Sequence, residues 1–140
     1  MPRFRRAGLA LTVVPFALAL SGCSVVGAFT PHVEPAIYDS AKEFKAADTS
    51  PIGSPTFIPD DATVIRVDYD TQTGAAIMTY TSKKLLVDGV CKSQTTAPKP
   101  TIDDSWWPVS GIPSTASKCP DGWSAFAIGS QVYAARTAAK

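Results

Sequence analysis

The residues that could do chemistry include two aspartate doublets, Asp60-Asp61 and Asp103-Asp104. Paired carboxylates can hold a calcium ion or share general acid and base work. Adjacent residues of an extended strand point to opposite faces, so neither doublet is a preformed chelate. Each doublet also suits a structural role, because Asp61 can start a turn and the other pair can occupy the first turn of a helix. The sequence therefore predicts no metal site.

The sole histidine, His32, stands in a proline-rich stretch that we expect to be a mobile spacer. A general base must be held in position to transfer a proton, so His32 is expected to be solvated rather than catalytic. The predicted folded region offers no serine–histidine–aspartate or cysteine–histidine set, and the sequence has no glycine-rich phosphate loop. These features predict a protein that is not an enzyme and that holds no cofactor.

Three tryptophans, Trp106, Trp107 and Trp123, lie near a cysteine in the sequence. Exposed tryptophans can stack on sugar rings or anchor a protein interface. The favoured interpretation is that they cover the core beneath a long loop, and the alternative is that they form a binding surface. Because Trp106 and Trp107 are neighbours and must point in different directions, one of them can be core and the other exposed.

Cys91 and Cys119 are expected to form a disulfide, because an exported chain with an even number of remaining cysteines usually pairs them. The bond would close a loop of about 29 residues and stabilise the fold by about 3–4 kcal/mol. The alternative is a pair of metal ligands. Two thiols with no nearby histidine do not complete a tetrahedral zinc site, so the disulfide is preferred.

The first residues have the pattern of an export signal. Arg3, Arg5 and Arg6 precede an uncharged apolar run over residues 7–20, which is too short for a comfortable transmembrane helix. The run ends in the tetrapeptide Leu20-Ser21-Gly22-Cys23. An aliphatic residue, two small residues and a cysteine in this register resemble a bacterial lipobox.

That resemblance implies that the Cys23 thiol receives a diacylglyceryl group and that a signal peptidase cuts after Gly22. Cys23 would then be the lipidated first residue, anchored on the extracytoplasmic face of the cell membrane. The alternative is a secreted protein in which Cys23 falls there by chance. The pair Arg5-Arg6 leaves the export route open between the general secretory and the twin-arginine pathways.

The charge of the chain is small, with a formal net value of +1. The three arginines of the signal segment are lost on cleavage, so the exported part is weakly acidic. It therefore offers no electrostatic footprint for nucleic acid or for anionic lipid.

Residues 1–22 are expected to form the signal peptide, residues 23–56 a lipid-anchored tether rich in proline, serine and threonine, and residues 57–140 the folded domain. The tether includes a possible short helix over residues 35–48, in which Ile37, Ala41 and Phe44 share one face. Period-two patterns and turn residues predict strands at 63–69, at 75–82, within 84–92, and in a last hairpin over 122–138 turning at Gly129-Ser130. The segment 101–108 is expected to form one helical turn.

The expected fold class is therefore α+β and rich in β structure. It comprises a four- to five-stranded antiparallel sheet, one or two short helices and one disulfide. The lipobox, the spacer and the compact two-cysteine domain together resemble small lipoproteins found in actinobacteria, a resemblance that implies no activity. We expect a non-enzymatic, membrane-anchored protein that binds a protein or cell-wall partner. The alternative is a module that binds a small molecule or glycan through the region of Trp106, Trp107 and Trp123.

Overall fold

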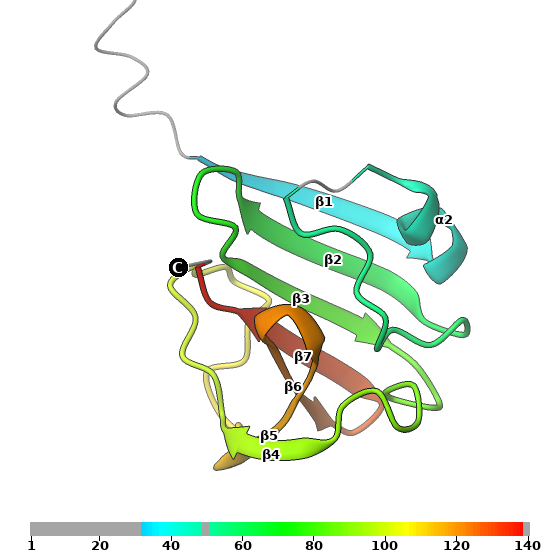
Figure 1. Cartoon of the computed structure of the whole chain (residues 1–140), viewed down its shortest axis with the longest axis vertical. Coiled ribbons are helices and arrows are strands. Elements are labelled where there is room, and N and C mark those ends of the chain that lie inside the picture. Colours follow the sequence, from blue (N-terminus) through cyan, green and yellow to red (C-terminus); the bar gives the residue numbers. More distant parts are fainter. Residues whose placement is uncertain (1–31, 49–50, 139–140) are drawn as a thin grey trace, which may run out of the picture. The chain divides into compact units, whose positions relative to one another are not determined.

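The structure of the chain, a computed structural model, describes residues 32–48 and 51–138. They form one antiparallel sheet of seven strands in the spatial order β1-β2-β3-β7-β6-β5-β4 (Figure 1). The strands are β1 (Val33–Ser40), β2 (Thr63–Asp70), β3 (Ala76–Thr81), β4 (Ser93–Thr96), β5 (Thr115–Lys118), β6 (Trp123–Ile128) and β7 (Gln131–Arg136). The described residues also contain helix α2 (Ala41–Ala46) and the 3-10 turn η1 (Pro120–Gly122). The β-rich antiparallel class is confirmed, but the expected number of strands is wrong.

The strands with alternating sequences lie where the pattern predicts them. These are β2 and β3, joined by a short turn, and the hairpin of β6 and β7. Gly129, the first residue of the hairpin turn, has a φ of 64°, which glycine adopts at little cost. In the turn after β2, the Asp70 carboxylate accepts the backbone N–H groups of Gln72 and Thr73 at 2.8 and 2.9 Å. Local sequence therefore determines these two hairpins.

The expected strand within residues 84–92 does not form. Leu85 and Gly89 have φ values of 59° and 74°, which interrupt an extended backbone. The chain instead forms β4 and β5, which are four residues each, largely polar and mostly exposed. Such strands carry no strong alternation, because neither buries a full apolar face. The predicted helical turn at 101–108 is a non-helical turn, in which the Trp107 N–H donates to the Asp104 carbonyl at 3.0 Å.

The expected helix over 35–48 is strand for its first half. Strand β1 pairs with β2 along its length, and only then does α2 begin. Ser40 caps the helix by accepting the Glu43 N–H at 3.3 Å. Ala41 and Phe44 of α2 are buried in the core. The expectation of a tether over residues 23–56 is therefore wrong for residues 33–48 and 51–56, which belong to the fold, as the burial of Ile52 shows for the second range. Residues 23–31 lie outside the described residues.

The two faces of the sheet bury separate apolar clusters. Helix α2 and the segments 51–62 and 85–91 cover one face, and residues 97–114, which join β4 to β5 and which we call the cap, cover part of the other. The largest buried side chains of the first cluster are Phe44, Phe57, Ile58, Ile65, Met78, Tyr80 and Trp123. The second cluster contains Ile77, Ile102, Trp107, Phe126 and Tyr133. On the same face, Ile37 of β1 stays 64 % exposed, so the cap covers β1 incompletely.

The outer edge of β1 is a poor template for another strand. The Thr71 N–H donates to the His32 carbonyl at 2.9 Å, so the alternate residues 33, 35, 37 and 39 direct their backbone groups outward. Pro35 has no N–H to offer at that edge. The outward N–H of Asp39 already donates to the Glu43 carboxylate at 2.9 Å. Proline and a capped donor are devices that protect edge strands from association.

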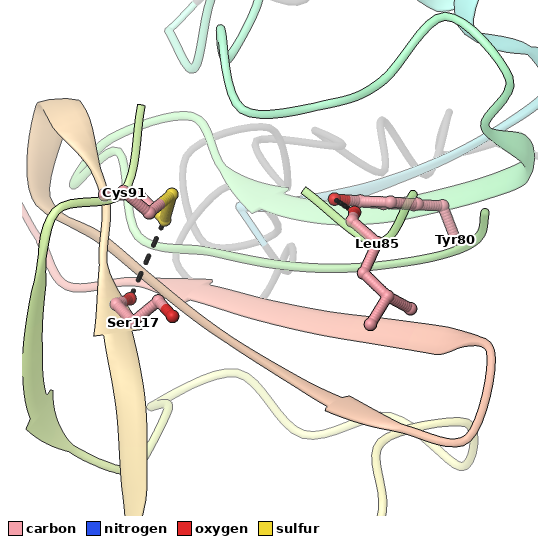
Figure 2. The surroundings of a disulfide bond; sticks show 5 residues. Tyr80, Leu85, Cys91 and Ser117 are labelled. Atoms are coloured by element: carbon pink, nitrogen blue, oxygen red, sulfur yellow. Dashed lines mark hydrogen bonds between the residues drawn. A yellow bond between two sulfur atoms is a disulfide. The ribbon is translucent and has the colours of Figure 1, made fainter. Parts of the chain in front are cut away.

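The disulfide lies at the base of the β4–cap–β5 unit. Cys91 and Cys119 are bonded, as expected, and flank the two strands. Figure 2 shows this region, where the Cys119 sulfur lies 3.7 Å from the carbonyl oxygen of Ser117. The Tyr80 hydroxyl donates to the Leu85 carbonyl at 2.7 Å, which fixes the segment that leads to Cys91 (Figure 2). The unit pairs with β6 at only two positions, so the disulfide adds a constraint that the ladder does not supply.

Candidate functional site

A groove of about 240 Å³ opens between strands β1 and β2 and the cap. Its walls include the side chains of Ile37, Arg66, Asp68, Asp104 and Trp106. Register explains the arrangement, because Ile37 is paired with Arg66 and Asp68 follows two residues later on the same face of the sheet. The volume is below the roughly 300–1,000 Å³ of sites for drug-sized ligands, so the groove suits a small group.

Two carboxyl groups meet in this groove. Asp68 is only 4 % exposed, and its side chain is hydrogen-bonded to that of Asp104, which also accepts the Ser105 hydroxyl at 2.9 Å. Burial, together with the neighbouring Asp104, raises the pKa of Asp68 to about 6. The hydrogen bonds from Ser105 and Asp68 hold the pKa of Asp104 below its usual range. Below about pH 6, Asp68 therefore keeps the shared proton and donates it to the Asp104 carboxylate.

The Asp68 proton makes folding stability depend on pH. Its pKa rises from the ordinary value of 3.8 to about 6, so folding takes up a proton between those values. This contribution is complete below about pH 4 and is lost as the pH rises to about 6. Relative to Asp68→Asn, which donates to Asp104 at every pH, the wild type should lose about 1–2 kcal/mol between pH 4 and 7, a value reduced because the groove admits water.

Urea unfolding of the wild type and of Asp68→Asn at several pH values measures that difference. Asp103→Asn is the matched control, because Asp103 neighbours Asp104 but lies outside this groove. The difference in the free energy of unfolding between Asp103→Asn and the wild type should stay constant between pH 4 and 7. A constant difference for Asp68→Asn as well would show that folding does not raise the pKa of Asp68.

Arg66 and Trp106 supply the other functional groups of the groove. Arg66 is exposed, and within residues 32–48 and 51–138 its guanidinium forms no ion pair. The half-buried Trp106 donates its indole N–H to Asp68, which orients the ring. An unpaired guanidinium offers donors to an anion, and an indole presents an apolar face. The groove therefore combines a cationic group, an acid pair and an aromatic wall.

The separation of the carboxyl groups favours binding over glycoside hydrolysis. In glycosidases the two carboxyl groups stand about 5–9.5 Å apart, on either side of the bond that is cleaved. Here Asp68 and Asp104 are in direct hydrogen-bond contact, so no sugar carbon or attacking water fits between them. The pair can instead bind a hydrogen-bond donor or a cation that takes the place of the shared proton.

The structure separates the three tryptophans that the sequence grouped. Trp123 is buried in the first cluster, where its ring meets Phe57 edge-on at 5.8 Å. Trp107 packs in the second cluster against Phe126 and Tyr133, with ring centroids 5.8 and 5.9 Å away. Only Trp106 of the three lines the groove. The interpretation as core is thus confirmed for two of them, and Trp106 remains the candidate for binding.

The other predicted site residues have structural partners or lie elsewhere. Asp60 forms an ion pair with Lys45 at 2.6 Å, and Asp61 accepts the Ser82 hydroxyl and the Lys83 N–H at 2.8 and 2.9 Å. A larger hollow of about 400 Å³ includes both aspartates, and in these contacts their carboxylates hold neighbouring parts of the fold. His32 is exposed and lies immediately before β1. Across the described part of the chain, no three histidine, cysteine, aspartate or glutamate side chains gather as metal ligands do.

Sequence reasoning missed Arg66 and Asp68. Both lie in the strand predicted at 63–69, on the face taken to be polar and solvated. The available signal was a pair of opposite charges two positions apart on that face. Nothing in the local sequence indicates that the cap would return to bury one of them.

Comparison of the chain with protein-family models, with curated proteins and with solved structures gives no match. No helix among the described residues is long and apolar enough to cross a lipid bilayer. The expected lipidation site, Cys23, lies outside the described residues.

Proposed function

We propose that this protein is a lipid-anchored, extracytoplasmic binding protein without catalytic activity, and that it binds a cell-wall partner through the groove of Arg66, Asp68, Asp104 and Trp106. The observation that carries the binding role is the groove itself. It brings an unpaired guanidinium, an acid pair and an oriented indole to one opening. Such a small set of convergent polar groups beside an apolar wall is typical of ligand sites.

Two further features support this proposal. The protected edge of β1 disfavours a protein partner that adds a strand, which is a common mode of peptide recognition. The contact between Asp68 and Asp104 disfavours hydrolysis. The proposed location rests on the lipobox ending in Cys23.

Anchoring is tested by Cys23→Ala in cells that carry the full chain. The wild type should incorporate a labelled fatty acid and sediment with membranes, whereas Cys23→Ala should lose the label, remain unprocessed after Gly22 and show a higher apparent mass. Cys91→Ala serves as a control, because it removes a thiol that is expected to carry no lipid. Fatty-acid label on the Cys23→Ala protein would overturn the anchoring proposal.

Binding is tested by sedimenting the detergent-solubilised, processed protein with isolated cell walls. Trp106→Ala should reduce the bound fraction at least several-fold, because it removes one wall of the groove. Val109→Ala is the matched control, since Val109 lies in the cap, is 98 % exposed and is not part of the groove. Equal binding by the wild type and by Trp106→Ala would exclude the groove as the binding site.

A further inference from the structure

We infer that the groove binds a small zwitterion, a molecule that carries a carboxylate and an ammonium group close together, such as an α-amino acid or an amino-acid unit of a cell-wall peptide. This inference rests on the proposed function and names the ligand class of the same site. It follows from two features of the groove: among the described residues, Arg66 has no carboxylate partner, and Asp68 and Asp104 have no cationic partner.

The first part of the inference comes from Arg66. Arg66 lines the groove from β2, and within the described ranges its guanidinium has no carboxylate within 4.0 Å. A guanidinium presents a planar fork of donors that matches a carboxylate in a bidentate manner. The nearest acids of the groove are bonded to one another and to Ser105, so they do not use this fork. A carboxylate from the ligand would complete it.

The second part comes from the acid pair. Asp68 is 4 % exposed and is in hydrogen-bond contact with Asp104. Two adjacent carboxylates do not both ionise easily, so below about pH 6 the pair holds one proton. An ammonium group placed on the pair would replace that proton and would allow both carboxylates to ionise. The ligand would thus exchange its own positive charge for a proton that is released to solvent.

The charges facing the groove come from two elements. Strand β2 supplies Arg66 and Asp68, the cap supplies Asp104, and β1 contributes only apolar side chains, among them Ile37, which is 64 % exposed. In a groove of this size, one small molecule that pairs with both Arg66 and the acid pair must carry both charges close together. Ile37 and the Trp106 ring offer an apolar wall to a side chain of the ligand. A neutral sugar would leave Arg66 without its carboxylate.

Three related probes test the inference by titration calorimetry or NMR on the processed protein. Leucine carries both charges, leucinamide lacks the carboxylate, and N-acetyl-leucine lacks the ammonium. Leucine should bind at least about tenfold more tightly than either derivative, because each derivative forfeits one charge-assisted pair. Binding of leucine below pH 6 should release a proton, which is measured by comparing buffers of different ionisation enthalpy.

Two variants test which residue binds each charged group of the ligand. Arg66→Gln should remove the preference for leucine over leucinamide, and Asp104→Asn should remove the preference for leucine over N-acetyl-leucine. Arg136→Gln is the matched control, because Arg136 follows the buried Ala134 on the opposite face of the sheet and should leave both preferences intact. Circular dichroism of each variant verifies that the fold is retained.

The outcomes separate this inference from the proposed function. If the three probes bind equally, if none of them binds, or if the sugars glucose and N-acetylglucosamine bind more tightly than leucine, the zwitterion is overturned. The groove would still be the binding site provided that Trp106→Ala weakens sedimentation with cell walls. If Trp106→Ala has no effect on sedimentation, the proposed function fails as well.

Discussion

Trp123→Ala is expected to lower the free energy of unfolding by about 3–5 kcal/mol, the range for removing a large buried aromatic side chain. Trp123, the first residue of β6, is 1 % exposed and packs against Phe57, so its removal leaves a cavity that the rigid sheet cannot close. Small domains are stable by about 5–15 kcal/mol in total, so the variant should unfold far more readily than the wild type. Urea unfolding followed by far-UV circular dichroism measures the loss.

Trp106→Ala is the matched comparison, since it removes the same atoms from a half-buried position in the groove. Trp106→Ala should lower the free energy of unfolding by about 1–2 kcal/mol, because a half-buried ring hides less apolar area from water than a fully buried one. Trp123→Phe adds a second test. The Trp123 indole N–H has no hydrogen-bond partner in the described part of the chain. Trp123→Phe therefore reduces the buried volume, which destabilises the fold, but it also removes a buried, unsatisfied donor, which stabilises it. It should therefore cost clearly less than Trp123→Ala. Equal losses for Trp123→Ala and Trp106→Ala would contradict the buried position of Trp123.

Removal of the disulfide is the second change with a large expected effect. The double variant Cys91→Ala, Cys119→Ala should lose about 3–4 kcal/mol of stability, because the unfolded chain regains the freedom of a loop with a sequence separation of 28. Since that loop carries the cap, ligand affinity should fall in parallel. Guanidinium unfolding under non-reducing conditions measures the stability of the variant and of the wild type.

Reduction of the wild type by dithiothreitol should give the same loss without any change of sequence, which separates the bond from the packing of the cysteine side chains. Dithiothreitol should leave the stability of the double variant unchanged. A loss below about 1 kcal/mol would mean that the β4–β5 ladder and the packing of Trp107 hold the cap by themselves.

The sequence by itself determined those elements whose signal lies within a few neighbouring residues, together with the disulfide. The alternation of residues 63–69 and of the following segment predicted β2 and β3, and Gly129 predicted the turn of the last hairpin. The disulfide followed from a count, because two remaining cysteines allow a single pairing. In these cases the signal lies within a few residues of the element, so no distant contact is needed to read it.

Only the tertiary structure decided the identity of β1, β4 and β5 and the composition of the groove. β1 contains Pro35 and resembles a helix in its apolar spacing, and pairing with β2 makes it a strand. Asp68 looks like a solvated residue of a polar face until the cap places Asp104 and Trp106 over it. The physical reason is sequence separation. The groove joins strands β1 and β2 to a loop that follows four strands, and burial, charge pairing and the shared proton arise only when these segments meet.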